Sequence, residues 1–456
     1  MIKAKKLKEI ATIYDLILNQ CYVGEAKGEC IQLSDNIKIK TGQKREGFIA
    51  VRIRRLSPPN MVEVEIVNEP YTVISELQPK TKLHLKNDLM NKMESRIRKA
   101  AIMIKDAAEK GRNIYLRHHA DADGYCGALA LESVIIPIIE KQTNKIWQNY
   151  RRMPMKAPYY DYSDALKDIS FFKDQTALRK KPLLIIVDNG CGEQDLLSLE
   201  RIKLYDVDVI IIDHHLYSKK VDELVEVHVN PRVFGGEGDI CSGMLGYEIA
   251  SQIGKPDPMF AAVAGIADMS GNEFVEPYVK LSGKKRELLE NVATCLDFEA
   301  WQLRFMESNA VYDLFNEKQE KVIALVLPEV EKSMEKYKVV IKKFLKVEKL
   351  RKGTLTILDL DKTVLMNSYP SSGKVTGIAR RMQKGPGVTL GIAEDFITIR
   401  VDGLKFSLEK LMTTLKKKFP YAMINGGGHD YAATIKFIPA AKEEVKQEFL
   451  RYIKGL

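Results

Sequence analysis

Along the chain, the spacing of apolar and polar positions changes twice, and each change marks a different kind of structure. In the first ninety residues apolar and polar positions alternate over four short runs, at 28–33, 36–40, 47–55 and 61–66. A period of two, interrupted by glycine and proline, predicts short antiparallel strands. We expect a helix over Lys3–Leu18 and then these strands, so that residues 1–88 form a small β-barrel.

Between Met90 and Asn272 the pattern becomes an alternation of apolar runs with helical stretches. The apolar runs predict strands at 114–116, 183–187, 207–212 and 225–229. Helical patterns separate them at 90–109, 127–140 and 242–253. Strands that are almost continuously apolar and alternate with helices indicate a parallel sheet covered on both faces. The predicted fold class is therefore α/β, with this main domain at 89–276.

The rest of the chain contains a polar helical segment and a second mixed unit. Residues 277–350 are predicted to form a helical connector, which could also supply an oligomer surface. An α+β unit is predicted at 351–456. Its expected elements are strands at 355–360, 388–393 and 396–401, a helix near 374–383, and a glycine-rich turn at Gly426-Gly-Gly-His429.

Composition restricts the classes of function. The apolar runs identified above fall short of the ~18 residues that a membrane span requires, and no secretory signal opens the chain. Six scattered cysteines without a Cys-x-x-Cys pair argue against a disulfide framework and against a cysteine-built zinc site. We expect a cytoplasmic protein without a membrane partner. The net charge of +10 suits a polyanion such as nucleic acid, although a uniformly basic proteome would give the same balance.

The first candidate for chemistry lies at a predicted strand end. Directly after the strand at 114–116 comes His119-Ala-Asp121-Ala-Asp123-Gly124. Alternate residues of an extended turn project to one side, which would bring one imidazole and two carboxylates together, and Gly124 permits a sharp entry into the next helix. These ligands suit a hard dication such as Mn²⁺ or Mg²⁺. A turn in which Asp123 caps the helix is the alternative.

Three further motifs follow in the same domain. Asp188 ends the apolar strand at 183–187, and Asp213-His214-His215 closes the strand at 207–212. Three successive titratable groups are costly at such a position unless they serve a site. Asp268 ends a helix of small residues, where an exposed helix-end aspartate is the commoner explanation. The carboxyl ends of the strands are nevertheless where open α/β sheets bind their ligands.

Together these side chains provide enough ligands for two adjacent metal ions that share one aspartate. A two-metal site ~3.5–4 Å wide generates hydroxide near neutral pH and stabilises the attacking and departing oxygens at phosphorus. Hydrolysis of a phosphoester therefore follows more naturally than acyl transfer. The sequence contains no Gly-x-Ser-x-Gly elbow and no Walker A loop.

The order and spacing of these motifs resemble the DHH phosphoesterase superfamily. His119-x-Asp121-x-Asp123, Asp188, Asp213-His214-His215 and Asp268 are similar to its motifs one to four. Gly426-Gly-Gly-His429 is similar to the signature of the C-terminal DHH-associated domain, and His228-Val-Asn-Pro231 with Ser242-Gly243 matches the sequence usual between motifs three and four. The resemblance spans roughly residues 90–456.

The resemblance implies two divalent cations, Mn²⁺ preferred and Mg²⁺ possible, that share Asp188. One ion would also take His119 and Asp121, and the other would take Asp123, His214 and Asp268. His118 departs from the family pattern, and we expect a structural role for it.

The remaining matched residues would act on the substrate. Asp213 would orient an imidazole, and His215 would contact the scissile phosphate or protonate the leaving group. In the C-terminal unit, basic side chains and glycine N–H groups would grip substrate phosphates. These residues are Lys374, Arg380, Arg381, Gly426, Gly427, Gly428 and His429.

Three features favour nucleic acid over the small molecules that other superfamily members hydrolyse. The chain is basic, it has an added basic β-module, and aromatic residues mingle with arginines at Tyr150-Arg-Arg152 and Pro158-Tyr-Tyr160. The module would be an OB-like barrel that binds single strands, although a merely solvated strand face would show the same pattern. Aromatic stacking and a cationic track are typical of single-strand binders, although ordinary packing explains the tyrosines equally well.

In its overall organisation the chain resembles archaeal RecJ-like nucleases, and among them the Hef-associated nuclease group. This resemblance implies a manganese-dependent 3′→5′ exonuclease on single strands, DNA favoured over RNA, that is homo-oligomeric and works beside a repair helicase or replication partner. A phosphodiesterase for short oligonucleotides (nanoRNA) or cyclic dinucleotides is the first alternative, and a non-catalytic replication scaffold is the second.

Overall fold

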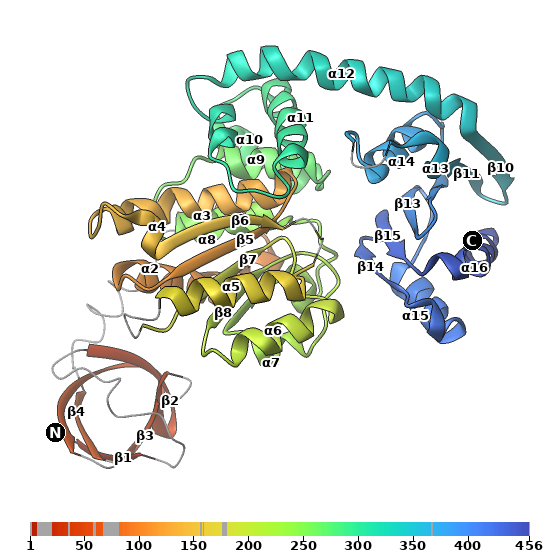
Figure 1. Ribbon diagram of the computed structural model, residues 1–456. Helices are drawn as coiled ribbons and strands as arrows, with labels where there is room; N and C mark the ends of the chain where they lie inside the picture. Colours follow the sequence, from red (N-terminus) through yellow and green to blue (C-terminus); the bar gives the residue numbers. More distant parts are fainter. Residues whose placement is uncertain are drawn as a thin grey trace. The chain divides into compact units, whose positions relative to one another are not determined.

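The computed structural model describes residues 2–6, 21–34, 37–57, 61–66, 82–155, 157, 159–175, 180–365 and 368–455. The chain divides into two compact units, Met1–Lys82 and Leu83–Leu456. The described part of the first unit consists of strands, drawn in red in Figure 1, whereas the second unit contains two sheets with their helices.

The first unit is an antiparallel sheet that closes on itself. Its strands are β1 (Ile2–Lys6), β2 (Cys21–Ser34), β3 (Ile37–Ser57) and β4 (Met61–Ile66), in the order β1-β4-β3-β2. The long strand β3 pairs with β1 near its start and with β4 near its end. Because β1 also pairs with β4, these three strands form a ring. The prediction of a barrel-like N-terminal module is confirmed.

Two details predicted for this module are wrong. Residues 2–6 form strand β1 instead of starting a helix over Lys3–Leu18, because pairing with β4 gives their backbone groups partners in the sheet. The rest of that predicted helix lies outside the described residues. The strands predicted at 36–40 and 47–55 are parts of the single strand β3, since Arg45 and Glu46, which lie between them, are paired with β2.

The second unit begins with a five-stranded parallel sheet. Its strands, in the order β6-β5-β7-β8-β9, are β5 (Ile114–His119), β6 (Tyr150–Met155), β7 (Leu183–Val187), β8 (Asp208–Ile212) and β9 (Val227–Val229). This sheet confirms the predicted α/β class. Strand β6 is absent from the prediction because its sequence lacks β-branched residues. Its place at the sheet edge also accommodates Pro154.

Both faces of the parallel sheet are covered, and successive strand residues supply the two faces in turn. Leu183, Ile185 and Val187 belong to one buried cluster, and Leu184 and Ile186 belong to the other. On the first face lie α2 (Asp88–Glu109), α3 (Ala122–Glu140), α8 (Ser242–Ser251) and α9 (Met259–Ala267). On the second lie α5 (Tyr162–Gln175), α6 (Leu196–Lys203) and α7 (Val221–Leu224) (Figure 1). The shorter helices of this domain are α4 (Ile146–Asn149), η3 (Glu193–Asp195) and η4 (Pro231–Phe234).

Helix α3 is long and apolar enough to cross a membrane by length and composition. Its mean hydropathy over 18 residues is 1.5, but 78% of that window is buried within the structure. Burial of this extent is what the core helix of a globular domain shows. The apolar stretch is nevertheless longer than the runs considered in the sequence, because isolated polar residues interrupt it.

A helical segment connects the first domain of this unit to its second sheet. It comprises α10 (Asn272–Ser282), α11 (Arg286–Gln302), η5 (Ala310–Leu314) and the long α12 (Gln319–Phe344). The predicted helical connector extended to residue 350. The residues after α12 instead form strand β10 (Leu345–Leu350). They do so because they pair along their whole length with β11 (Gly353–Asp359).

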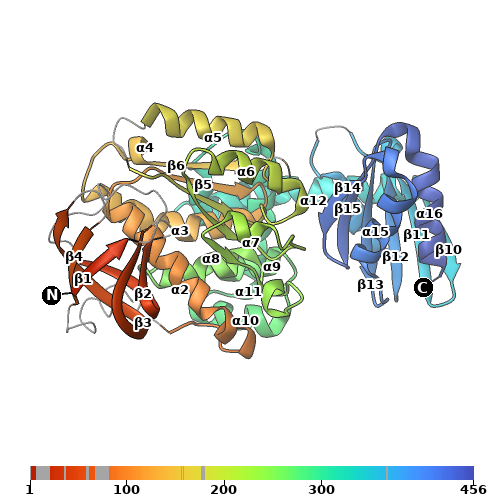
Figure 2. The same ribbon diagram turned by 90° about the horizontal axis from the view of Figure 1, so that it is seen from below.

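The C-terminal sheet has six strands, in the order β10-β11-β12-β13-β15-β14, and only β11 and β12 are parallel neighbours. The remaining strands are β12 (Gly387–Ile392), β13 (Phe396–Asp402), β14 (Asn425–Gly428) and β15 (Ala432–Lys436). Helices α12, α13 (Leu360–Thr363) and α14 (Ser372–Arg381) cover one face. The other is covered by α15 (Leu408–Lys418) and α16 (Lys442–Lys454) (Figure 2). Short turns η6 (Pro420–Ala422) and η7 (Pro439–Ala441) complete this domain.

Helices α3 and α8 approach each other closely through glycines. A Cβ atom built on Gly246 would lie 2.9 Å from the Cα atom of Gly127, and one on Gly127 would lie 3.2 Å from the Cα atom of Gly243. Both neighbours are backbone atoms, so a side chain at these positions would force the helices apart. This contact fixes the two helix N-termini next to each other.

Replacing Gly246 with valine is expected to destabilise the second unit by about 1–3 kcal/mol, the usual cost of overpacking a close contact. The added side chain would meet the backbone of α3, which cannot rotate away. Urea unfolding followed by circular dichroism measures the change. An unchanged unfolding midpoint would show that the two helices can separate without loss.

Candidate metal centre

The predicted ligands meet at the carboxyl ends of three neighbouring strands. His119 is the last residue of β5, Asp188 follows β7, and His214 lies two residues beyond β8. Asp123 lies in the first turn of α3, and Asp268 caps the end of α9. The structure therefore brings side chains that are far apart in the sequence to one edge of the sheet.

Asp188 lies at the centre of the cluster. It is 2% exposed. Its Oδ2 atom is 3.3 Å from His119 Nδ1, and its Oδ1 atom is 3.4 Å from His214 Nε2. The Ser242 hydroxyl donates a hydrogen bond of 3.0 Å to the same Oδ1 atom. Asp188 has a φ of 64°, a left-handed conformation that is costly for a residue other than glycine and is concentrated at functional sites.

One group of potential ligands consists of His119, Asp121 and Asp188. Their donor atoms all lie within 4.8 Å of one another, and His119 Nδ1 is 2.7 Å from Asp121 Oδ2. The other carboxylate oxygen of Asp121 accepts a hydrogen bond from the Gly124 N–H, so Asp121 also caps helix α3. The helix cap thus holds this carboxylate in place.

A second group consists of Asp123, Asp188 and His214, again with donor atoms within 4.8 Å. Both carboxylate oxygens of Asp123 accept backbone N–H groups at the start of α8, from Ser242 at 3.0 Å and Gly243 at 2.8 Å. A helix N-terminus stabilises a negative charge, which fixes this buried carboxylate beside the site.

Asp268 lies close to this second group. Its Oδ2 atom is 3.8 Å from His214 Nδ1, and that nitrogen is 2.9 Å from the Gly238 carbonyl oxygen. A hydrogen bond to this carbonyl leaves His214 Nε2 facing Asp123 and Asp188. The structure therefore places Asp268 beside the predicted ligand set.

Asp213 and His215 form a pair at the rim of the cluster. Asp213 Oδ1 is 2.8 Å from His215 Nδ1 and also accepts the backbone N–H of His214. Asp213 is buried, whereas the His215 side chain is 30% exposed. Because the carboxylate engages Nδ1, the imidazole presents its Nε2 atom away from Asp213. This is the geometry that an orienting role for Asp213 requires.

The buried carboxylates of the cluster shift one another's pKa values. Burial and the Asp188 charge raise the pKa of Asp123 well above its ordinary value. Burial, opposed by His214, raises the pKa of Asp268 to about 6. Although burial works in the opposite direction, hydrogen bonds from His119 and His214 hold the pKa of Asp188 well below its usual range. Neighbouring buried carboxylates that cannot all carry a negative charge at the same time are typical of cation sites.

The donor set fits divalent cations. The Oδ2 atoms of Asp213 and Asp268 and the Nε2 atom of His429 are buried without a hydrogen-bond partner. Carboxylate and imidazole donors without thiolates suit Mn²⁺ or Mg²⁺. Asp188 belongs to three of the four groups of potential ligands in the described residues, as a shared ligand would.

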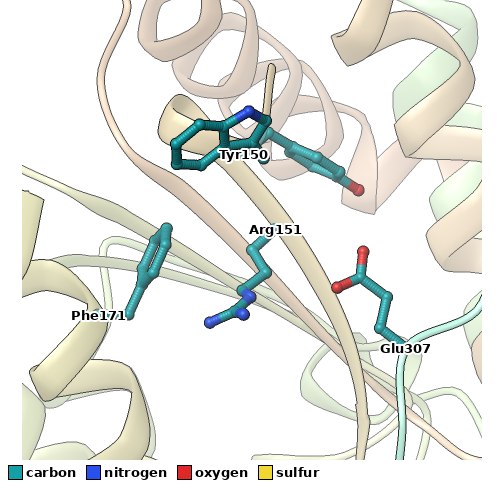
Figure 3. A pocket seen from close by; sticks show the side chains of 5 residues that line it. Tyr150, Arg151, Phe171 and Glu307 are labelled. Carbon is teal, nitrogen blue, oxygen red and sulfur yellow. The ribbon is translucent and has the colours of Figure 1, made fainter. Parts of the chain in front are cut away.

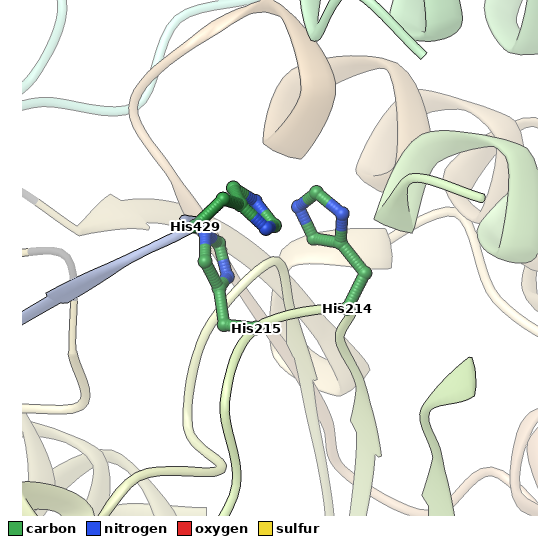
Figure 4. A group of neighbouring side chains, drawn as sticks. All are labelled: His214, His215 and His429. Atoms are coloured by element: carbon green, nitrogen blue, oxygen red, sulfur yellow. The ribbon is translucent and has the colours of Figure 1, made fainter. Parts of the chain in front are cut away.

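The C-terminal domain contributes His429 to the same site. Its ring centroid lies 4.6 Å from that of His214 and 4.9 Å from that of His215, and the three rings converge in Figure 4. Burial and these two histidines lower the pKa of His429, which keeps the imidazole neutral. Arg232 Nη2 lies 3.3 Å from its Nδ1 atom. His429 was assigned by sequence to phosphate binding, and the structure brings it to the metal ligands.

The comparisons with known proteins agree with this geometry. A sequence profile described as the DHH family, N-terminal domain, matches residues 113–267. A solved structure, described as the DHH domain of a member of the s1p family of ribosomal proteins, is 33% identical with a TM-score of 0.78. The match covers 84% of this chain and 97% of that one. This chain belongs to the DHH superfamily.

Two further similarities extend the comparison. An uncharacterised protein, MJ1198, of Methanocaldococcus jannaschii is 32% identical over 94% of this DHH chain. The chain spans 63% of the length of that curated relative. RecJ from Thermus thermophilus, solved in complex with Mn²⁺, matches with a TM-score of 0.55 at 14% identity, over 85% of this chain and 58% of RecJ. That likeness shows a RecJ-like fold.

The basic residues predicted to bind substrate in this DHH protein differ in their surroundings. Lys374 forms an ion pair with Asp297, whose other oxygen accepts the Ala122 N–H at the start of α3. Arg380 is buried and donates to the Gly385 carbonyl within the C-terminal domain. Arg381 is in the last turn of α14. The structure therefore places Lys374 next to the metal centre and gives the two arginines positions in the C-terminal domain.

The predicted glycine-rich turn is a strand. Gly426, Gly427 and Gly428 lie in β14 and pair with β15. A Cβ atom on Gly426 would lie 2.2 Å from the Thr434 carbonyl oxygen, so a side chain cannot replace its hydrogen. Apart from its two neighbours in the chain, none of the residues that the structure describes has an atom within 4 Å of the Cβ position of Gly427. Close approach of β15 accounts for the glycine at position 426, and the phosphate contact predicted for the three glycines stays a prediction.

The proposed nucleic-acid contact at Tyr150, Arg152 and Tyr160 is wrong, because all three side chains are buried. The Tyr150 hydroxyl and Arg152 Nε both donate to Glu132, and the Tyr160 hydroxyl donates to Asp168. These contacts satisfy charges inside the domain. For Tyr160, the alternative of ordinary packing is confirmed.

Three side chains contact the DHH site although the sequence predicted no role for them. Ser242 donates to Asp188, Arg232 Nε donates to the His214 carbonyl, and Asp297 joins α3 to Lys374. Ser242 and Arg232 lie within or beside the family motifs quoted above, which is a usable signal. Asp297 lies in a polar helix whose local pattern does not distinguish it.

Adjacent arginines allow a matched test of substrate binding. Replacing Arg381 with alanine is expected to raise KM by about 10- to 100-fold with little change in kcat, the loss of one charge-assisted contact. Replacing the buried Arg380 is expected to lower the free energy of unfolding, because its contacts are internal. Steady-state kinetics and urea unfolding separate the two effects. An unchanged KM for Arg381→Ala would remove this side chain from the substrate path.

Proposed function

We propose that this chain, a member of the DHH family of phosphoesterases, is a metal-dependent phosphodiesterase that degrades single-stranded nucleic acid. The observation that carries the proposal is the position of Asp188. This buried carboxylate is common to three groups of potential ligands, drawn from the ends of β5, β7 and β8. Such a shared carboxylate is the arrangement expected of a two-metal phosphodiesterase.

Two divalent cations, preferably Mn²⁺ and otherwise Mg²⁺, fit this donor set. His119, Asp121 and Asp188 would hold one, and Asp123, Asp188, His214 and Asp268 would hold the other. When bound, such a pair activates the attacking water and stabilises the charge that develops on the phosphate oxygens.

The chain's own residues position the substrate and move the proton. His215, held through Nδ1 by Asp213, is available through its other nitrogen to contact the scissile phosphate or to protonate the leaving oxygen. His429 lies against His215 and His214, so the C-terminal domain closes this side of the site. Lys374 and Arg381 supply positive charge for neighbouring phosphates, as do the N–H groups near Gly427.

The substrate that we propose is single-stranded DNA, degraded in the 3′→5′ direction. The net charge of +10 and the OB-like N-terminal module support a nucleic-acid substrate. The resemblance to the Hef-associated group is the basis for the proposed 3′→5′ direction and for a homo-oligomeric state. On the same basis we propose that the protein works in the cytoplasm beside a repair helicase or replication partner. RNA belongs in the same test, because one similar structure is described as a member of a family of ribosomal proteins.

The decisive assay uses single-stranded DNA and RNA of several lengths, labelled at either end, with Mn²⁺ and Mg²⁺ compared. We expect mononucleotides to be released from the 3′ end of long DNA strands, with greater activity in Mn²⁺. Faster cleavage of dinucleotides than of long strands would replace this proposal with a short-oligonucleotide phosphodiesterase. Absence of hydrolysis with either metal ion, despite metal binding, would favour the non-catalytic scaffold.

A further inference from the structure

A second cavity lies at the end of the parallel sheet opposite the metal centre. It has a volume of about 310 Å³ and is lined by Trp147, Tyr150, Arg151, Phe171 and Glu307. Tyr150 is the first residue of β6, whereas Met155 at its other end pairs with His119. This volume is at the lower end of the range for small-ligand sites, about 300–1,000 Å³. The cavity therefore suits a single planar group.

The aromatic walls come from two different elements. Trp147, in the short helix α4, is 67% exposed, an unusual position for the largest apolar side chain. Phe171, in α5, is fixed by an edge-on contact with Tyr115, with ring centroids 5.0 Å apart. An exposed indole near a fixed phenyl ring provides surfaces on which a flat ligand can stack.

The polar groups of the cavity carry opposite charges. The Arg151 guanidinium lies 5.5 Å from the centre of the Phe171 ring, and Figure 3 shows it between Phe171 and Glu307. Both charged side chains are exposed. Burial raises the pKa of Glu307, while the charges of Arg152 and Arg151 and the Arg152 backbone N–H act against this shift, so Glu307 keeps a negative charge facing Arg151. One carboxylate acceptor and one guanidinium donor thus face the same small space.

We propose that this cavity binds one guanine base of a single-stranded nucleic acid, stacked on Trp147 and Phe171. A carboxylate accepts the donors on the Watson–Crick edge of guanine, and an arginine donates to O6 and N7 on its other edge. Guanine presents two adjacent donors, N1–H and the N2 amino group, to a single carboxylate, whereas cytosine presents only its N4 amino group and thymine only its N3–H, so these bases would bind more weakly. A cationic peptide would be repelled by Arg151, which disfavours a protein segment as the occupant.

The position of the cavity gives it a role in holding the strand away from the cleavage site, a role that rests on the proposed function. Along β6, at ~3.3 Å per residue, the cavity and the end of β5 are separated by ~17 Å. That distance corresponds to about five nucleotides at the ~3.4 Å rise of a stacked strand. A strand too short to span this distance cannot occupy both places, so the cavity would favour longer substrates.

The direct test is nucleotide binding by the full chain without metal ions, followed by tryptophan fluorescence. The chain has two tryptophans, Trp147 and Trp301, so Trp147→Phe leaves one reporter outside the cavity. We expect guanosine monophosphate to quench the natural protein in a saturable manner, and Trp147→Phe to abolish this response. The matched control Trp301→Phe should retain it. Equal quenching by cytidine monophosphate, or an unchanged response in Trp147→Phe, would overturn the proposal.

The polar contacts are tested by affinity. Glu307→Gln and Trp147→Ala should each raise the dissociation constant of guanosine monophosphate, the latter by about 5- to 150-fold, the range for loss of one base stack. Arg304→Gln is the control, because Arg304 stacks on Trp301 and Phe305 instead of lining this cavity. Circular dichroism verifies that each variant is folded.

Hydrolysis separates this inference from the proposed function. Trp147→Ala should raise KM for long single strands and leave dinucleotide cleavage unchanged. If the natural protein degrades single strands and neither assay responds to Trp147→Ala, the base site is wrong and the function stands. If guanosine monophosphate quenches Trp147 but no nucleic acid is cleaved, the base site stands and the function is wrong. If no nucleotide quenches Trp147 at millimolar concentration, the cavity is not a base site, and a protein contact becomes the better explanation.

Discussion

Replacing Asp188 with asparagine is expected to abolish hydrolysis in both Mn²⁺ and Mg²⁺. The amide keeps the size of the side chain but removes the charge that three ligand groups share. Metal affinity should fall by more than the ~10- to 100-fold that loss of an outer partner causes. The measurements are single-turnover cleavage and calorimetric titration with Mn²⁺. Because His119 and His214 stabilise the Asp188 charge in the folded protein, we expect the metal-free variant to lose some stability, and circular dichroism checks that it remains folded.

Asp206 offers a matched control for this experiment. It is a second aspartate with a positive φ, 53°, but it is exposed and pairs with Lys181 away from the cluster. Asp206→Asn should leave cleavage and Mn²⁺ binding unchanged. Full activity in Asp188→Asn would show that the ions, if present, do not share this carboxylate, and the proposed mechanism would have to be abandoned.

Replacing His215 with glutamine is the second change with a large expected effect. If this imidazole protonates the leaving oxygen, kcat should fall by about 10²- to 10⁴-fold, the usual contribution of a positioned acid. Mn²⁺ binding should persist, because the donor groups of Asp123, Asp188 and His214 remain. Cleavage at saturating substrate measures kcat, and titration with Mn²⁺ measures the affinity for the metal ion.

The partner of His215 provides the accompanying test. Asp213→Asn keeps a side chain that can contact Nδ1 but removes its charge, so kcat should fall less than in His215→Gln and the pH profile should shift. A loss of Mn²⁺ binding in His215→Gln equal to that in Asp188→Asn would instead make His215 a ligand. In that case His215 would bind the metal ion together with His214 and His429, whose donor atoms lie within 4.8 Å of one another.

The sequence predicted most of the side chains that form the candidate metal centre, because these residues are marked locally. Each acid or imidazole follows an apolar run, and parallel strands bring their carboxyl ends to one edge, as His119, Asp188 and Asp213 demonstrate. The alternative weighed for that turn, a helix cap at Asp123, is wrong, because Asp121 caps α3 and Asp123 accepts N–H groups at the start of α8. Both carboxylates remain among the candidate metal ligands.

The features that the sequence missed depend on contacts between distant elements. Tyr150 and Arg152 resemble a single-strand track, but Glu132 of α3 buries and pairs both. Residues 2–6 become a strand because β4, about sixty residues later, supplies their partners. Asp297 acquires a role only because α11 ends next to the N-terminus of α3. Local periodicity contains no information about such pairings.

The bridge from Ala122 through Asp297 to Lys374 has a practical consequence for dissecting this protein. The region matched by the family profile ends at residue 267, before Asp268 and thirty residues before Asp297. A fragment that ends at residue 267 would lack Asp268. It would also lack Asp297, which accepts the first N–H of α3. The smallest piece able to preserve an intact centre must extend past α11, and one that also retains His429 needs almost the whole second unit.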